Sequence, residues 1–258
     1  MDTDDPALVA ALQVVIASAE QPMEPTRTQH YAVAATPAGY AVSEESDPLA
    51  VVASSQAVRD TIYARSHRRA FELAQLKGWM LLYGGLVDIE EQRILLVGGG
   101  GAARTLAVLG LGLRGARLQG ADSVLLREGQ VFAVPRPLML EPELRQTVAE
   151  LGPLWPRLPR EGTVVVLDPA LHLGLPWTLS IAPLDHVVLF DDGPGAIGCR
   201  PSEPAEILTD LVRHAAPTTP PRPELVTELS ETLSTARCHR LGTGDALAAE
   251  DAIRRLAC

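Results

Sequence analysis

Lysine is nearly absent from this sequence: Lys77 is the only one, although the 258 residues include 22 basic side chains. Almost all of the positive charge is therefore carried by arginine. A lysine ammonium is the usual ligand of the outer phosphates in a nucleotide-binding loop. If such a loop is present, its lysine has no obvious substitute elsewhere in the chain.

Cysteine is scarce as well, with Cys199, Cys238 and Cys258 as the three examples. An odd number without paired spacing argues against a disulfide framework and against a zinc knuckle. It favours reduced thiols, as in the cytosol. The hydrolase patterns Gly-x-Ser-x-Gly and His-Glu-x-x-His are also absent, so a hydrolase with either signature has no support.

Long apolar runs are missing. No stretch of about 18 apolar residues and no signal-peptide pattern occurs, so the sequence predicts a cytoplasmic protein without a membrane span. The formal net charge of −10 disfavours binding to nucleic acid or to an anionic membrane. The expected partner is a small molecule, a peptide or a protein.

The length allows a small domain followed by a larger one. Residues 1–50 mix short apolar stretches with proline, serine, threonine and acidic residues, which is typical of short strands. We therefore predict a small β-rich N-terminal domain over residues 1–50. Residues 51–258 alternate strand and helix patterns and are predicted to form the main α/β domain, a mixed sheet with flanking helices.

The most informative stretch is a run of four glycines. Residues 94–97 are apolar, Gly98, Gly99, Gly100 and Gly101 follow, and an apolar helix pattern continues to residue 113. This order indicates a strand, a tight loop and a helix, as in the phosphate-binding template G-x-x-x-x-G-K-[ST]. Aligned on Gly98, the template's second glycine falls on Ala103, its lysine on Arg104 and its hydroxyl on Thr105.

The match is thus damaged at two of its four positions. Gly98 to Gly101, with Arg104 and Thr105 nearby, still predict exposed N–H groups for a phosphate. The alternative is that the glycines only make a strand-to-helix turn. Asp122 lies at the edge of a later strand pattern, where a P-loop enzyme holds its magnesium carboxylate. Thr105 and Asp122 are therefore the candidate Mg²⁺ ligands.

The order of these segments resembles the HPr serine kinase/phosphorylase family, in its shorter HPr-kinase-related bacterial branch, some of whose members accompany peptide-modification genes. The resemblance covers roughly residues 50–256. It rests on residues 98–106, 115–126, 135–138, 183–189, 193–195 and 240–245. It implies a P-loop-containing sheet of HPr-kinase type, ATP and Mg²⁺ as cofactors, and phosphoryl transfer to a Ser or Thr of a protein or peptide. It also implies a homo-oligomer.

Four positions depart from that family. The family's P-loop lysine, P-loop glycine, catalytic aspartate and strand-opening histidine fall on Arg104, Ala103, Ala121 and Tyr83. Arginine keeps the charge but not the point-charge geometry of lysine. Loss of a general base costs about 10²–10⁴-fold in rate. The replacements favour weakened or absent ATP binding.

Two hypotheses remain open at this stage. In the first, the chain is a pseudokinase or accessory protein that binds a peptide or protein partner. In the second, it is an active phosphotransferase, with Asp122 as the catalytic carboxylate, or an enzyme repurposed for peptide modification. The missing lysine and first aspartate favour the first hypothesis, whereas Asp122, Thr105 and the glycines keep the second open.

Overall fold

The structure is a computed structural model. Its described residues form two compact units, one up to Lys77 and one from Gly78 onward. Each unit is described by itself. The residues that the structure describes are 5–13, 29–148, 150–161, 163–191, 197–214, 223–243 and 246–257. Of the segments that carry the resemblance, 193–195 and the last two residues of 240–245 therefore lie outside the described residues.

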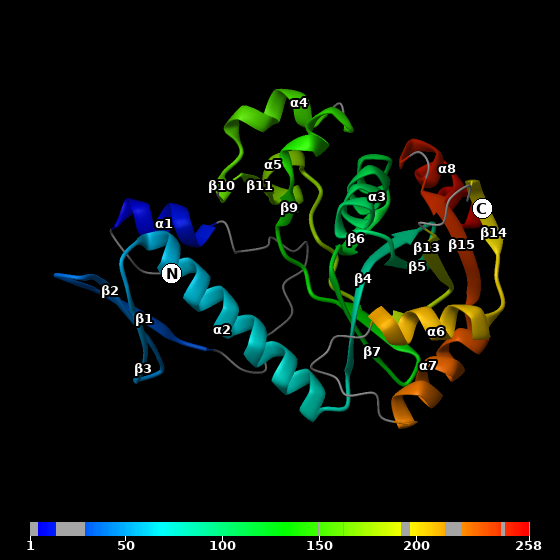
Figure 1. The fold of residues 1–258 in the computed structure, drawn as a ribbon, viewed down its shortest axis with the longest axis horizontal. Helices are drawn as coiled ribbons and strands as arrows, with labels where there is room; N and C mark the ends of the chain where they lie inside the picture. Colours follow the sequence, from blue (N-terminus) through cyan, green and yellow to red (C-terminus); the bar gives the residue numbers. More distant parts are fainter. Residues whose placement is uncertain are drawn as a thin grey trace. The chain divides into compact units, whose positions relative to one another are not determined.

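The first unit is a three-stranded antiparallel sheet with two helices (Figure 1). Its elements are α1 (Pro6–Gln13), β1 (Tyr31–Thr36), β2 (Gly39–Glu44), β3 (Asp47–Val52) and α2 (Ser55–Leu76). Leu8, Val42 and Val58 form its buried core. The expected boundary near residue 50 differs from the structure, because that position lies inside β3 and α2 packs on the same core. A local composition change cannot show which unit a helix packs on.

The second unit contains a nine-stranded mixed sheet, as the α/β prediction requires. The strand order is β12-β8-β7-β4-β5-β13-β15-β14, and β6 pairs with β4 outside this path. The strands are β4 (Met80–Ile89), β5 (Gln92–Gly98), β6 (Arg117–Gly120), β7 (Ser123–Arg127), β8 (Gln130–Ala133), β12 (Ala182–Pro183), β13 (His186–Asp191), β14 (Ile197–Pro201) and β15 (Arg237–Thr243). Strands β5, β13 and β15 are parallel and the remaining pairs are antiparallel.

Strands β4 and β5 are apolar over most of their length, as expected for strands that helices cover on both faces. Their hairpin turns at Glu90 and Glu91, both with positive φ (48° and 69°), which suits the twist of a two-residue connection. One face is covered by α3 (Gly101–Leu113) and α8 (Ala246–Ala257). The other face is covered by α6 (Pro204–His214) and α7 (Pro223–Thr235).

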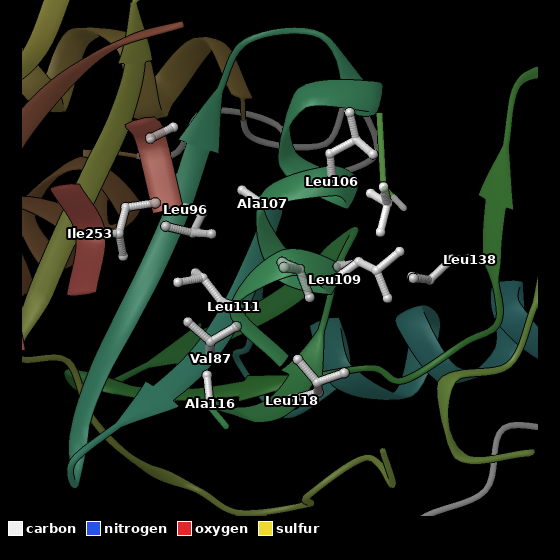
Figure 2. Close-up of a cluster of buried hydrophobic side chains, with 14 of the residues drawn as sticks. Val87, Leu96, Leu106, Ala107, Leu109, Leu111, Ala116, Leu118, Leu138 and Ile253 are labelled. Atoms are coloured by element: carbon white, nitrogen blue, oxygen red, sulfur yellow. The ribbon is translucent and has the colours of Figure 1, made fainter. Parts of the chain in front are cut away.

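A second, smaller sheet packs on the outer side of α3, in the order β10-β11-β9. Its segment contains β9 (Leu138–Leu140), η1 (Pro142–Gln146), α4 (Leu151–Leu154), η2 (Trp155–Arg157), β10 (Arg160–Glu161), β11 (Val164–Leu167) and α5 (Pro169–Leu173). Figure 2 shows how Leu106 and Leu109 of α3 lie between the main sheet and Leu138. Helix α3 is therefore packed on both sides, which holds its N-terminus in place.

Within the described part of the chain, no helix combines the length and the apolar character that a bilayer crossing needs.

Candidate functional site

The glycine turn joins β5 to α3 and is very short. Gly98 ends the strand with φ +75°, and Gly99 follows with φ +59°. Both values lie in the left-handed region that favours glycine. A Cβ on Gly98 would also lie 2.8 Å from the carbonyl oxygen of Phe190 on the neighbouring strand β13. Gly98 is therefore required both for its dihedral and for close strand packing.

Helix α3 begins earlier than the phosphate-loop template suggests. Gly100 is its extended N-cap residue, with φ −66° and ψ 151°, so only Gly99 and Gly100 lie between strand and helix. The amide of Ala103 already donates to the carbonyl oxygen of Gly100, at 3.0 Å. No side chain caps the helix. The first-turn N–H groups are thus presented by a helix end, not by a wide loop.

Arg104, at the template's lysine position, points back toward the turn. It is 7% exposed, and its Nη1 donates to the carbonyl oxygens of Gly98 at 2.9 Å and Gly99 at 3.2 Å. Its Nε is buried and has no hydrogen-bond partner among the described residues. Burial lowers the pKa of Arg104 below its ordinary value, and the charge of Asp122 opposes the shift.

A cavity of about 230 Å³ lies beside the first turns of α3. It brings together Thr105 and Asp122, the two residues predicted as metal ligands. The lining does not include Gly98, Gly99 or Arg104. The described residues that line it are Ala102, Thr105, Ala121, Asp122, Arg136, Pro137, Leu138, Met139, Glu141 and Leu144.

Asp122 is held by an arginine that the sequence did not single out as a site residue. Its Oδ2 lies 2.5 Å from Nη2 of Arg136 and accepts a hydrogen bond of 3.0 Å from the Ser123 hydroxyl. Both side chains of the ion pair are less than one-third exposed. Arg136 stands between two prolines in the segment 135–138 that contributed to the resemblance, and this placement was the only signal available.

The structure also locates Ala121 and Tyr83, two of the positions at which the sequence departs from the HPr-kinase pattern. Ala121 lines the cavity and is 4% exposed, so a methyl group occupies the place expected for the catalytic carboxylate. Tyr83 lies on β4 opposite Ser123 and is 40% exposed. The cavity lining holds two acidic side chains, Asp122 and Glu141, against the one basic side chain of Arg136. This balance does not complement a highly anionic triphosphate.

The residues do not fit a bound Mg²⁺. That ion prefers near-octahedral oxygen ligands, commonly one or two carboxylates together with substrate phosphates and water. Here the cavity presents the Thr105 hydroxyl, the solvent-exposed Glu141 carboxylate and the Asp122 carboxylate, which is already paired with a guanidinium. Across the described ranges, no group of three or more acidic, histidine or cysteine side chains is arranged to hold a metal.

Comparison with solved structures gives remote likenesses. No family model and no curated protein matches the chain. Among solved structures, the chain is similar to the Hpr(Ser) kinase/phosphatase from Coxiella burnetii, over 68% of this chain and 89% of that chain. The TM-score is 0.33 and the sequence identity is 9%. A likeness of this size is remote, and it identifies no functional residue.

Proposed function

We propose that this chain is a non-catalytic protein with a phosphotransferase-like α/β unit, which binds a peptide or protein partner and does not transfer phosphate. The ion pair between Asp122 and Arg136 carries the proposal. Phosphoryl transfer depends on positioned cations and on a carboxylate that can orient the attacking hydroxyl. In this cavity the one carboxylate at the expected place is neutralised from within the chain, and Ala121 supplies no other.

The size and lining of the cavity favour a side chain of a partner over a nucleotide. Its volume of about 230 Å³ is below the range of about 300–1,000 Å³ that is usual for small-molecule pockets. Leu138, Met139 and Leu144 form an apolar part, and Met139 is 42% exposed. Arg136 and Glu141 give it a charged part. This mixture suits an amphipathic peptide side chain.

The second candidate is an active Ser/Thr phosphotransferase. It is favoured by one observation, that Thr105 and Asp122 line the same cavity beside the N-terminus of α3. In that case Asp122 would have to leave Arg136 before it could contact a metal or a hydroxyl. Any ATP bound by the chain would then involve Gly98 to Gly101, Arg104 and Thr105.

Two measurements separate these candidates. Titration calorimetry with Mg-ATP measures nucleotide binding, and a radiolabelled assay measures transfer of the γ-phosphate to protein or peptide acceptors. We expect no transfer by the wild type above the level of the Asp122→Ala variant. Transfer that disappears in Asp122→Ala would overturn the proposal and establish the enzyme.

Partner binding is tested by site-specific photo-crosslinking. A photoreactive amino acid in place of Met139 is expected to crosslink a bound peptide or protein. The same amino acid in place of Leu171, which is 71% exposed and does not line the cavity, is the matched control. Equal crosslinking from both positions would show that the cavity is not the binding site.

A further inference from the structure

The disagreement between the cavity and a divalent metal points to a specific role for Arg136. We propose that the guanidinium of Arg136 is the built-in counter-cation of Asp122 and takes the charge position that a metal ion would otherwise hold. The site is then independent of divalent metal. This inference rests on the proposed absence of phosphoryl transfer, but it is tested by metal binding and not by activity.

The backbone around Arg136 is fixed, so the ion pair is built into the fold. The residue lies between Pro135 and Pro137, whose rings restrict φ. The amide of Val134 donates to the carbonyl oxygen of Ser123, at 2.9 Å, next to Asp122. On either side, β8 belongs to the main sheet and β9 to the small sheet. The segment that carries Arg136 is therefore anchored at both ends.

The backbone of Asp122 is held in place as well. The backbone carbonyl oxygen of Asp122 accepts a hydrogen bond of 3.0 Å from the amide of Gly84 on β4. The carboxylate oxygen Oδ2 receives both the Arg136 guanidinium and the Ser123 hydroxyl. Two fixed segments thus hold the two charges together, which lowers the entropy cost of the pair compared with flexible surface side chains.

A divalent cation on this carboxylate would compete directly with Arg136. The cation would be repelled at close range by the guanidinium of Arg136. The buried charge of Arg104, which interacts electrostatically with Asp122, would add to this repulsion. The further oxygen ligands that line the cavity are the Thr105 hydroxyl and the solvent-exposed Glu141 carboxylate. One hydroxyl and one exposed, hydrated carboxylate do not offset the repulsion of two guanidinium groups, so the expected metal affinity is low.

Binding of Mn²⁺ to the full chain, followed by electron paramagnetic resonance, tests this proposal. Mn²⁺ shares the preference of Mg²⁺ for oxygen ligands and is directly observable. We expect the same titration for the wild type and for Asp122→Asn. Arg136→Ala should bind one Mn²⁺ about tenfold more tightly than the wild type, because the competing cation is gone. The double variant Arg136→Ala/Asp122→Asn should lose that gain.

Arg127→Ala is the matched control, because Arg127 also pairs with an acidic neighbour, Glu128, but outside the cavity. It should titrate as the wild type does. If circular dichroism shows that Arg136→Ala is unfolded, Arg136→Gln is used in its place. If that variant is unfolded too, the proposal is tested by comparing Mn²⁺ binding of the wild type with that of Asp122→Asn.

Two results would overturn the proposal: a wild-type Mn²⁺ site that Asp122→Asn removes, and an Arg136→Ala titration equal to that of the wild type. Neither result by itself bears on phosphate transfer. Conversely, metal-independent transfer by the wild type would defeat the proposed function and leave the role of Arg136 in place.

Discussion

The Arg104 side chain donates a hydrogen bond of 2.9 Å to the carbonyl oxygen of Gly98, six residues earlier at the end of β5. The same nitrogen donates to Gly99, at 3.2 Å. A cation at the phosphate-binding position of the template is therefore used to satisfy the carbonyl groups of its own turn. This contact closes the junction between β5 and α3.

Arg104→Ala is expected to destabilise the second unit by about 2 kcal/mol, because two hydrogen bonds from a charged donor are lost, one of them to the carbonyl oxygen of the buried Gly98. Urea denaturation followed by circular dichroism measures the loss. Arg213→Ala is the control, since Arg213 is 71% exposed and pairs with Asp210 on the surface of α6. An effect of Arg104→Ala as small as that of the control would show that the contact does not stabilise the turn.

Comparing Gly98→Ala with Gly129→Ala separates the cost of a left-handed backbone from the cost of a steric clash of the added Cβ. The φ angles are nearly equal, +75° and +72°, but a Cβ on Gly98 meets the backbone of Phe190 whereas one on Gly129 meets nothing within 4 Å. We expect Gly129→Ala to cost about 1 kcal/mol for the left-handed backbone alone. Gly98→Ala should cost about 2 kcal/mol more, since overpacking is added. Equal losses in denaturant unfolding would exclude the close approach to β13.

Gly110 on α3 makes room for the Glu250 carboxylate of α8, which pairs with Arg114 at 3.2 Å. A Cβ at position 110 would collide with that carboxylate. Gly110→Ala should therefore destabilise the protein by about 2 kcal/mol, despite the better helix propensity of alanine. Gly152→Ala, where a Cβ meets nothing within 4 Å, is the matched control.

The same clash can be measured by a double-mutant cycle. In the Glu250→Ala background, Gly110→Ala should cost clearly less than in the wild type, because the colliding group is gone. A cost that is independent of residue 250 would mean that α3 and α8 do not pack as described.

His186 and His239 form a buried pair on the parallel strands β13 and β15, with Nδ1 of His186 3.1 Å from Nε2 of His239. Burial lowers the pKa of both imidazoles below the ordinary value of 6.5. The positive charge of Arg237 lowers both further, and Asp185 opposes the shift at His186. The native state therefore favours the neutral pair.

It follows that the unfolded state binds more protons at these positions. The stability that the pair contributes is complete above about pH 6.5 and is lost as the pH falls through that value toward the lowered folded-state pKa values. The free energy of unfolding should then fall by up to about 1.4 kcal/mol per pH unit for each proton taken up. Urea midpoints between pH 7.5 and 5.5 measure this slope.

The double variant His186→Leu/His239→Leu should show a flatter profile in the same range, because neither position can titrate. An unchanged slope would assign the pH dependence to other groups.

Local pattern predicted the order of strand, glycine turn and helix over residues 93–113. Two apolar runs separated by conformationally permissive glycines favour this order without tertiary contacts, but the helix begins at Gly101, inside the glycine run. The same holds for Asp122 at the edge of a strand. The prediction of a mixed α/β sheet with flanking helices is confirmed, because alternating strand and helix patterns leave few other arrangements.

Tertiary structure decided which of these residues meet. Arg136, on the segment between β8 of the main sheet and β9 of the small sheet, pairs with Asp122, and β5 lies beside β13 although about ninety residues separate them. The helix α2 joined the first unit through its contacts with β2, which composition could not reveal. Charges, glycines and periodicity are properties of the chain, whereas the partner of a charge is set by which distant segments the packed core brings together.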